Sequence, residues 1–189
     1  MPGIHNPEAF ARLRKRAGFD KPLPVFVETG TYKGHTLAAA LASEEFDELH
    51  SVEISMSYWT NAKKVFHRHR PKVQVHFGDS ADIVPIMLAQ IPKPVFWYLD
   101  AHWWDHSPEP LDCPKDKFPL WNELAAIRAR FLNEIVVVAD IQALGAEDKR
   151  VPYQGWSGVT REAIVQFFGS RVVFMFEDDN RFVLSLRGC

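Results

Sequence analysis

Short runs of β-branched and aromatic residues alternate with longer amphipathic stretches from Leu23 to the end of the chain. This alternation is typical of βαβ units around a mainly parallel sheet, because each helix connects two strands and covers one face of the sheet. The pattern predicts seven strands, at residues 25–28, 49–54, 73–77, 95–100, 135–140, 171–177 and 181–186. It predicts helices between them at residues 36–43, 58–69, 81–90, 120–131 and 160–168.

The first residues of the chain predict a further helix that ends near Arg16. Asn6 suits the N-cap, Pro7 suits the first turn, and the helix dipole favours Glu8 there. With 189 residues, of which 47% are apolar, the chain can bury one sizeable core. We therefore expect a single domain over residues 1–189, with residues 1–22 as its leading helix and lead-in.

The last two predicted strands are separated only by Asp178-Asp179-Asn180. This connection is too short for a parallel crossover and suits a tight hairpin, so the final strand must be antiparallel. The order of elements predicts an α/β fold with a seven-stranded, mostly parallel sheet, a C-terminal antiparallel hairpin, and helices on both faces. A simple dinucleotide-binding fold does not need that hairpin.

Charge, hydropathy and cysteine content exclude several classes of protein. The chain has 22 Lys and Arg against 24 Asp and Glu, so it lacks the basic excess of a nucleic-acid-binding protein. The basic run at 63–70 is interpreted as the solvated end of a helix, and no apolar run is long enough for a membrane span. Cys113 and Cys189 form neither a disulfide framework nor a zinc pair, and Cys113 is expected to be non-catalytic. With no targeting signal in the first residues, we expect a cytoplasmic protein that binds neither membrane nor nucleic acid.

Acidic residues lie at the ends of the first three predicted strands. In open α/β sheets, ligands bind outside the carboxyl ends of the strands, where Glu28, Glu53 and Asp79 lie. The loop after Glu28 has the spacing G-x-x-x-G, which matches neither the dinucleotide loop nor the phosphate loop. A carboxylate at Glu53 can accept both hydroxyls of a ribose, and Asp79 with Ser80 can contact an adenine amine or cap the next helix. The three strand ends together predict one nucleoside-type ligand.

The segment FWYLDAHWWDH contains the densest group of reactive side chains. Asp100 ends a predicted strand and His102 follows it, and this pair suits a general base or a divalent metal. Asp140 ends the neighbouring strand, and two adjacent strand-end carboxylates suit Mg²⁺. Trp103 and Trp104 could line a substrate pocket, whereas His106 is expected to be an exposed loop residue. The long connections at 101–119 and 145–158 are expected to wall a substrate site.

The segments ETGTYKG, SVEIS, GDS and LDAHW resemble class I S-adenosylmethionine (SAM) methyltransferases, particularly the macrocin-O-methyltransferase-like and related small bacterial groups. The resemblance spans residues 25–140 and implies a Rossmann-like fold with SAM as cofactor. It implies that Gly30 and Gly34 with Glu28 hold the methionine end of SAM, that Glu53 holds the ribose, and that Asp79 with Ser80 meets the adenine. It also makes Thr31 and Tyr32 part of the cofactor-binding loop, with Tyr32 where the commoner loop has a third glycine.

Catechol and macrocin-type O-methyltransferases resemble this chain in having an aspartate after the fourth strand and an Asp-Asp or Asp-Asn pair after the fifth. Here Ile141 replaces the second member of the pair, which leaves His102 or Gln142 to substitute. We expect a methyltransferase that acts on a hydroxyl of a small molecule, with His102 as the base and Asp100 orienting it or holding a cation. The alternatives are an inactive SAM- or nucleoside-binding module and, more remotely, a metal hydrolase that uses Asp100, His102, His106 and Asp140. A homodimer is the oligomer we expect.

Overall fold

The computed structural model describes residues 3–102, 119–145 and 158–188. Its strands form one sheet of seven, in the order β3-β2-β1-β4-β5-β7-β6. The strands are β1 (Val25–Thr29), β2 (Glu48–Glu53), β3 (Val73–Phe77), β4 (Val95–Leu99), β5 (Glu134–Ala139), β6 (Val172–Asp178) and β7 (Arg181–Leu186). The first five are parallel, and β7 pairs antiparallel with both β5 and β6. The predicted mostly parallel sheet and the C-terminal hairpin are therefore confirmed.

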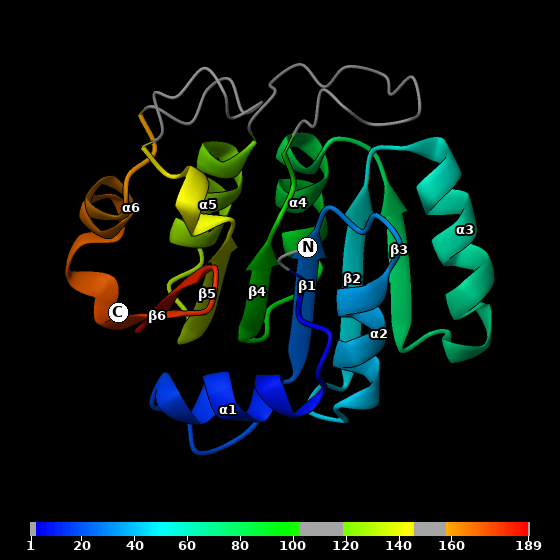
Figure 1. The fold of residues 1–189 in the computed structure, drawn as a ribbon, viewed down its shortest axis with the longest axis horizontal. Coiled ribbons are helices and arrows are strands. Elements are labelled where there is room, and N and C mark those ends of the chain that lie inside the picture. Colours follow the sequence, from blue (N-terminus) through cyan, green and yellow to red (C-terminus); the bar gives the residue numbers. More distant parts are fainter. Residues whose placement is uncertain (1–2, 103–118, 146–157, 189) are drawn as a thin grey trace.

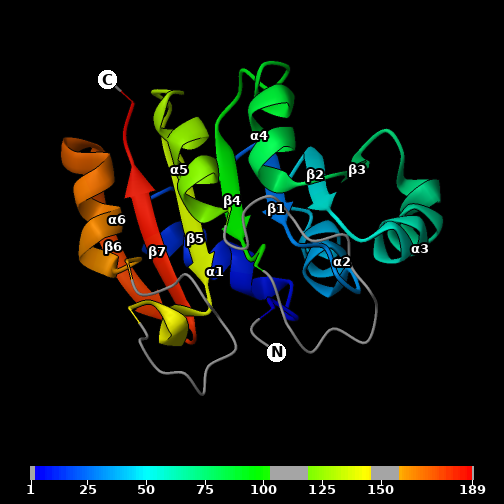
Figure 2. The ribbon, with the colours of Figure 1, turned by 90° about the horizontal axis from the view of Figure 1, so that it is seen from above.

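Helices cover both faces of the sheet, as predicted (Figures 1 and 2). One face carries α4, α5 and α6, and the other carries α1, α2 and α3 (Figure 2). The helices are α1 (Glu8–Arg16), α2 (His35–Ala42), α3 (Met56–Phe66), α4 (Ser80–Leu88), α5 (Leu120–Arg128) and α6 (Arg161–Phe168). None of the described helices is long and apolar enough to cross a membrane.

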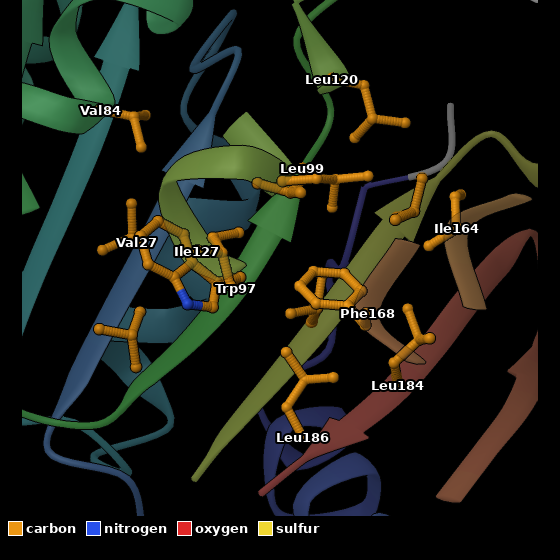
Figure 3. Close-up of a cluster of buried hydrophobic side chains, with 14 of the residues drawn as sticks. Val27, Val84, Trp97, Leu99, Leu120, Ile127, Ile164, Phe168, Leu184 and Leu186 are labelled. Atoms are coloured by element: carbon orange, nitrogen blue, oxygen red, sulfur yellow. The ribbon is translucent and has the colours of Figure 1, made fainter. Parts of the chain in front are cut away.

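Each face of the sheet has its own apolar cluster because side chains alternate along a strand. Under α4, α5 and α6, residues such as Trp97, Leu99, Ile127 and Phe168 pack together (Figure 3). Under α1, α2 and α3, a second cluster includes Phe10, Phe26, Phe46 and Phe96, whose rings meet mostly edge to face. The same alternation places Glu28, after Phe26, toward the second cluster, and Thr29, after Val27, toward the first.

The predicted ends of several elements differ from the structure by a few residues. Helix α1 begins at Glu8 with Pro7 at its N-cap, and Asn6 Oδ1 accepts the amide of Glu8 at 3.0 Å from outside the helix. Helix α3 begins at Met56, two residues earlier than predicted, because Ser55 caps it, and the last predicted turn is a 3-10 helix, His67–His69. Helix α5 ends at Arg128, three residues earlier than predicted.

Two of the strands that end one residue earlier than predicted affect the site. Strands β4 and β5 end at Leu99 and Ala139, so Asp100 and Asp140 lie just beyond the sheet. Asp140 has φ 54°, in the left-handed region, which turns the chain sharply after β5. The predicted pocket residues Trp103 and Trp104, together with His106 and Cys113, lie outside the described residues, as do Cys189 and most of both long connections.

Candidate functional site

The loop after β1 packs tightly against the end of β4. Gly30 has φ 81°, and a Cβ there would lie 2.8 Å from the carbonyl oxygen of Asp100. Gly34 has φ 75°, and a Cβ there would lie 3.0 Å from the ring of Phe66. Both positions need glycine for conformation and for space. Gly30 therefore brings the backbone of this loop close to the end of β4, at the edge of the sheet where a ligand of this fold would bind.

Glu53 connects this loop to the turn after β2. Its carboxylate accepts the amide of Tyr32 at 2.7 Å and the amide of Ser55 at 2.8 Å. Burial raises the pKa of Glu53, and the surrounding backbone amides partly offset that rise. One side chain thus holds the first two strand-end loops together, and Thr31 adds a buried hydroxyl contact with Ser51 on β2.

Tyr32 occupies the position where the commoner loop has its third glycine. Its φ is 49°, in the region that glycine favours, and its ring packs against Tyr58 of α3 with centroids 4.7 Å apart. The tyrosine therefore adopts a backbone conformation that glycine favours, and its side chain lies against α3.

Glu28 is a buried carboxyl next to two other acids. The residue is 2% exposed, and its Oε2 makes no hydrogen bond to the described residues. Burial raises its pKa well above the usual value, and Asp100 and Glu53 raise it further. An ammonium or another donor from a ligand would satisfy this oxygen.

Asp79 and Ser80 lie at the start of α4. Asp79 Oδ1 accepts the amide of Ala81 at 3.0 Å, so Asp79 is the N-cap of this helix, one of the two interpretations of the sequence. Ser80 is buried, and its hydroxyl lies near Glu123 of α5. Both residues follow β3 at the same edge of the sheet as Glu28 and Glu53.

His102 lies between the two aspartates that follow β4 and β5. Its Nδ1 is 3.8 Å from Asp100 Oδ1, and its Nε2 is 3.6 Å from Asp140 Oδ2. One ligand atom from each of the three residues lies within 4.8 Å of the others, which makes them a candidate metal group among the described residues. The convergence of Asp100 and Asp140 that the sequence predicted is therefore present, with the imidazole between them.

The charges of this cluster depend on its burial. Burial raises the pKa of Asp100 well above its usual value, and Asp140 and Glu123 raise it further. Burial likewise raises the pKa of Asp140, which His102 and Asn180 partly offset. Burial lowers the pKa of His102, against the opposing effect of Asp140. A neutral imidazole is the form that accepts a proton or binds a metal.

Sequence reasoning missed two residues of this site. Asn180, in the β6–β7 turn, donates its Nδ2–H to Asp140 Oδ1 at 2.7 Å, and its own Oδ1 accepts the amide of Gln142. The only sequence feature that could have pointed to Asn180 was the predicted hairpin, which returns the chain to the end of β5. Glu123, on α5, is 1% exposed. The sequence feature that could have revealed it is an acidic residue on the apolar stripe formed by Leu120, Leu124 and Ile127.

No family model matches the chain, and no curated protein matches it by sequence. Its fold is similar to solved methyltransferase structures. The SAH-bound methyltransferase PaMTH1 from Podospora anserina has a TM-score of 0.62 at 15% identity, over 95% of this chain and 76% of that one. The O-methyltransferase TomG from Streptomyces achromogenes, in complex with SAM, has a TM-score of 0.59 at 16% identity, over 97% and 79%.

A structure named as a putative rRNA-methylase from Clostridium thermocellum has a TM-score of 0.55 at 12% identity, over 98% of this chain and 99% of that one. These likenesses show that the chain has the Rossmann-like fold of class I methyltransferases. Because proteins named for different methylation activities have similar TM-scores, the likeness in fold does not identify the acceptor.

Proposed function

We propose that this chain is a SAM-dependent methyltransferase that transfers a methyl group to a hydroxyl of a small molecule. The observation that carries this proposal is the placement of the Glu53-bound glycine loop beside the Asp100–His102–Asp140 cluster at one edge of the sheet. Methyl transfer depends mainly on positioning the donor and the acceptor, and a nearby base removes the acceptor proton. The fold shared with proteins named as methyltransferases, among them the O-methyltransferase TomG, supports the same conclusion.

The chain's own residues fit SAM, which when bound supplies an electrophilic methyl group on a sulfonium. Glu28, with its buried unsatisfied oxygen, would face the cofactor's ammonium beside Gly30 and Gly34. Both oxygens of Glu53 accept backbone amides, and a carboxylate oxygen can also accept a ribose hydroxyl. The turn at Asp79 and Ser80 would meet the adenine.

His102 is the base in this proposal. Burial keeps its imidazole neutral, so that it can take the proton of the acceptor hydroxyl. The carboxyl groups of Asp100 and Asp140, at 3.8 and 3.6 Å from its two ring nitrogens, orient the ring, and Asp140 favours the imidazolium that forms. Asn180 fixes Asp140 through its hydrogen bond.

Asp100 and Asp140 would also hold a divalent cation such as Mg²⁺. Their donor set fits, since two carboxylates and an imidazole have ligand atoms within 4.8 Å of one another. With such a cation bound, His102 would supply the third donor that Ile141 does not, and its imidazole would then be a ligand in place of the base. A bound cation would supply a Lewis acid for the acceptor oxygen. Calorimetry with Mg²⁺ and Mn²⁺ on the wild type and on His102→Ala tests whether His102 contributes to cation binding.

Titration calorimetry with SAM and S-adenosylhomocysteine (SAH) tests the cofactor site. We expect the wild type to bind both compounds. Glu53→Gln should lower both affinities by roughly tenfold or more, because it weakens the contacts between the loop after β1 and the turn after β2. Glu48→Gln is the matched control, because Glu48 lies at the opposite end of the same strand. If the wild type binds neither compound, with or without Mg²⁺, the proposal is wrong.

SAH formation from SAM, measured with a panel of hydroxylated aromatic compounds, tests the reaction. His102→Ala should lower turnover by roughly a hundredfold, because a general base contributes about that much, and should keep the SAM affinity. His69→Ala, at an exposed position on the 3-10 turn, should change neither quantity. Binding of SAM without methylation of any compound would favour an inactive SAM-binding module.

A further inference from the structure

Glu123 is a buried carboxyl that the proposed reaction does not use. It lies in the first turn of α5, and only 1% of its surface is exposed. Neither of its oxygens makes a hydrogen bond to the described residues, and the buried hydroxyls of Thr29 and Ser80 make none to it. A buried carboxyl without a partner is costly, so we expect a group that the protein binds to satisfy it.

A small cavity adjoins Glu123. Three polar side chains line it, those of Asp100, His102 and Glu123, and its other described lining residues, such as Leu120 and Val138, are apolar. The centre of a water molecule fits within about 10 Å³ of the cavity, which is about the room that one water needs. A buried water makes about three hydrogen bonds, so three polar neighbours suit it. The cavity therefore fits a single water and has no room for a larger polar ligand.

The distances between His102 and its two aspartates also suit a bridging water. The ring nitrogens are 3.8 Å from Asp100 Oδ1 and 3.6 Å from Asp140 Oδ2, and both separations exceed the length of a hydrogen bond. A polar contact of this length is one that a water can complete. Asp100 lines the cavity together with His102, whereas Asp140 is not among its described lining residues. The contact of His102 with Asp100 is therefore the one that a water in the cavity would bridge.

We propose that this cavity binds one water that joins Glu123 to Asp100 and His102, and that Glu123 is thereby a positioning residue for the base. This inference rests on the proposed function. The two protons of a water suit the two carboxyl groups, and its oxygen accepts an N–H of the imidazole. The water thus fixes the orientation of the ring and the nitrogen that carries the proton. A leucine at position 123 would support α5 equally well but would remove one partner of the water.

Crystal structures of the wild type and of two variants, grown with EDTA to remove divalent cations, test the water directly. We expect density for one water within hydrogen-bond distance of Glu123 and Asp100. Glu123→Gln should keep this water because its amide oxygen still accepts a proton, and Glu123→Leu should lose it. The position differs from the candidate cation site, which Asp140 completes without Glu123. No water at this position in the wild type, or density with the anomalous signal of a metal ion, would overturn the inference.

Turnover and NMR test the positioning of His102. Glu123→Leu should lower kcat for SAH formation by about tenfold, the effect of roughly one hydrogen bond, and should keep the SAM affinity. NMR of the His102 ring nitrogens should show a change of tautomer in this variant. Glu123→Gln should stay near the wild type in both measurements. A purely structural role of Glu123 would lower stability without changing the tautomer.

Val138→Ile reaches the same water without altering Glu123, which keeps the test open if Glu123→Leu does not fold. Its added carbon takes up about the room of the water, so kcat and the tautomer should change as in Glu123→Leu. Val136→Ile is the matched control, since Val136 is buried on the same face of β5 and is not among the described lining residues. It should keep both quantities.

A wild-type tautomer in Glu123→Leu or in Val138→Ile would overturn the inference, as would equal effects of the isoleucine variants at 136 and 138. Crystallography and NMR need no turnover. A wild type that holds the water, and whose His102 tautomer changes in Glu123→Leu, would therefore support the positioning of His102 even if no compound is methylated, and that result would count against the proposed function alone.

Discussion

Gly30 is the residue at which backbone conformation and space act together. Its φ of 81° is unfavourable for any side chain, and a Cβ would lie 2.8 Å from the carbonyl oxygen of Asp100. Gly18 has a similar φ of 84° with nothing within 4 Å of its Cβ position. Substitutions at these two glycines therefore separate the cost of the backbone conformation from the cost of steric overlap.

We expect Gly18→Ala to lower the free energy of unfolding by about 1–2 kcal/mol, which is the cost of a left-handed residue. Gly30→Ala should lower it by roughly a further 1–3 kcal/mol, because the added methyl overlaps the backbone of Asp100. Urea denaturation followed by circular dichroism measures both. Equal losses of the free energy of unfolding in the two variants would contradict this prediction, because they would show that the loop after β1 rearranges around the added methyl without cost.

Tyr32 allows a second comparison at one residue. Tyr32→Gly removes the strain of φ 49° but also removes the ring contact with Tyr58, which is worth about 0.5–1.5 kcal/mol. Tyr32→Ala loses the contact and keeps the strain. The glycine variant should therefore be more stable than the alanine variant by about 1 kcal/mol, and it should still bind SAM because the amide that reaches Glu53 is unchanged. Denaturant titration gives the order of the two variants, and the reverse order would contradict this explanation.

The candidate site was predictable from sequence only where a residue lies at the end of a strand or directly after it. Glu28 and Glu53 lie at the carboxyl ends of β1 and β2, and Asp100 and Asp140 directly follow β4 and β5. Because these strands are parallel, their common edge follows from topology. Asn180 contacts Asp140 across 40 positions of chain, and no local pattern shows which strand end a hairpin turn will meet. The burial of Glu123 depends on how α4 packs against α5, which is a tertiary property.

At the scale of elements, the edge pair β2–β3 carries a histidine contact that makes it sensitive to pH. His50 Nδ1 and His76 Nε2 are 3.1 Å apart with stacked rings, and Glu48 is 3.8 Å from the other nitrogen of His50. Burial, and then His76, lower the pKa of His50 to about 4. The folded state thus favours the neutral imidazole, so the unfolded chain takes up a proton more readily.

The stability that His50 contributes should therefore be complete above the unfolded pKa of about 6.5 and should be lost as pH falls toward 4. We expect the advantage of the wild type over His50→Gln to shrink by about 2 kcal/mol between pH 7.5 and 4.5. Urea denaturation at several pH values measures this difference, with the exposed His69→Gln as control. Parallel pH profiles of the wild type and His50→Gln would show that the pair does not titrate on unfolding.

The elements themselves were predicted well because each pattern was local. β3 and β7 have the predicted bounds, β1 and β4 differ by one residue at one end, and β2, β5 and β6 are each shifted by one residue. The helix ends were less predictable, since Ser55 extends α3 by capping and Phe131, with φ 53°, lies beyond the end of α5. Such ends depend on caps and backbone conformations that several residue types can adopt.

For the molecule as a whole, the arrangement of charge matters more than its sum. The net charge is −2, yet a group of acids with pKa values raised by burial gathers at the carboxyl edge of the sheet, namely Glu28, Glu53, Asp100, Glu123 and Asp140. A raised pKa means that the folded state favours the protonated carboxyl. The stability from each group is complete below its unfolded pKa and is lost as pH rises through the folded value.

The chain without ligand should therefore be less stable near pH 8 than near pH 6. Glu123 alone, with a pKa near 7, accounts for about 1 kcal/mol of this loss, and Glu123→Gln should remove that share. SAM carries a net positive charge, so its binding should stabilise the folded chain and offset the repulsion among the ionised carboxyls near pH 8. Thermal and urea unfolding at both pH values, with and without SAM, measure these effects. A pH-independent free energy of unfolding, or a Glu123→Gln variant that keeps the full loss, would mean that these acids ionise without cost in the folded chain.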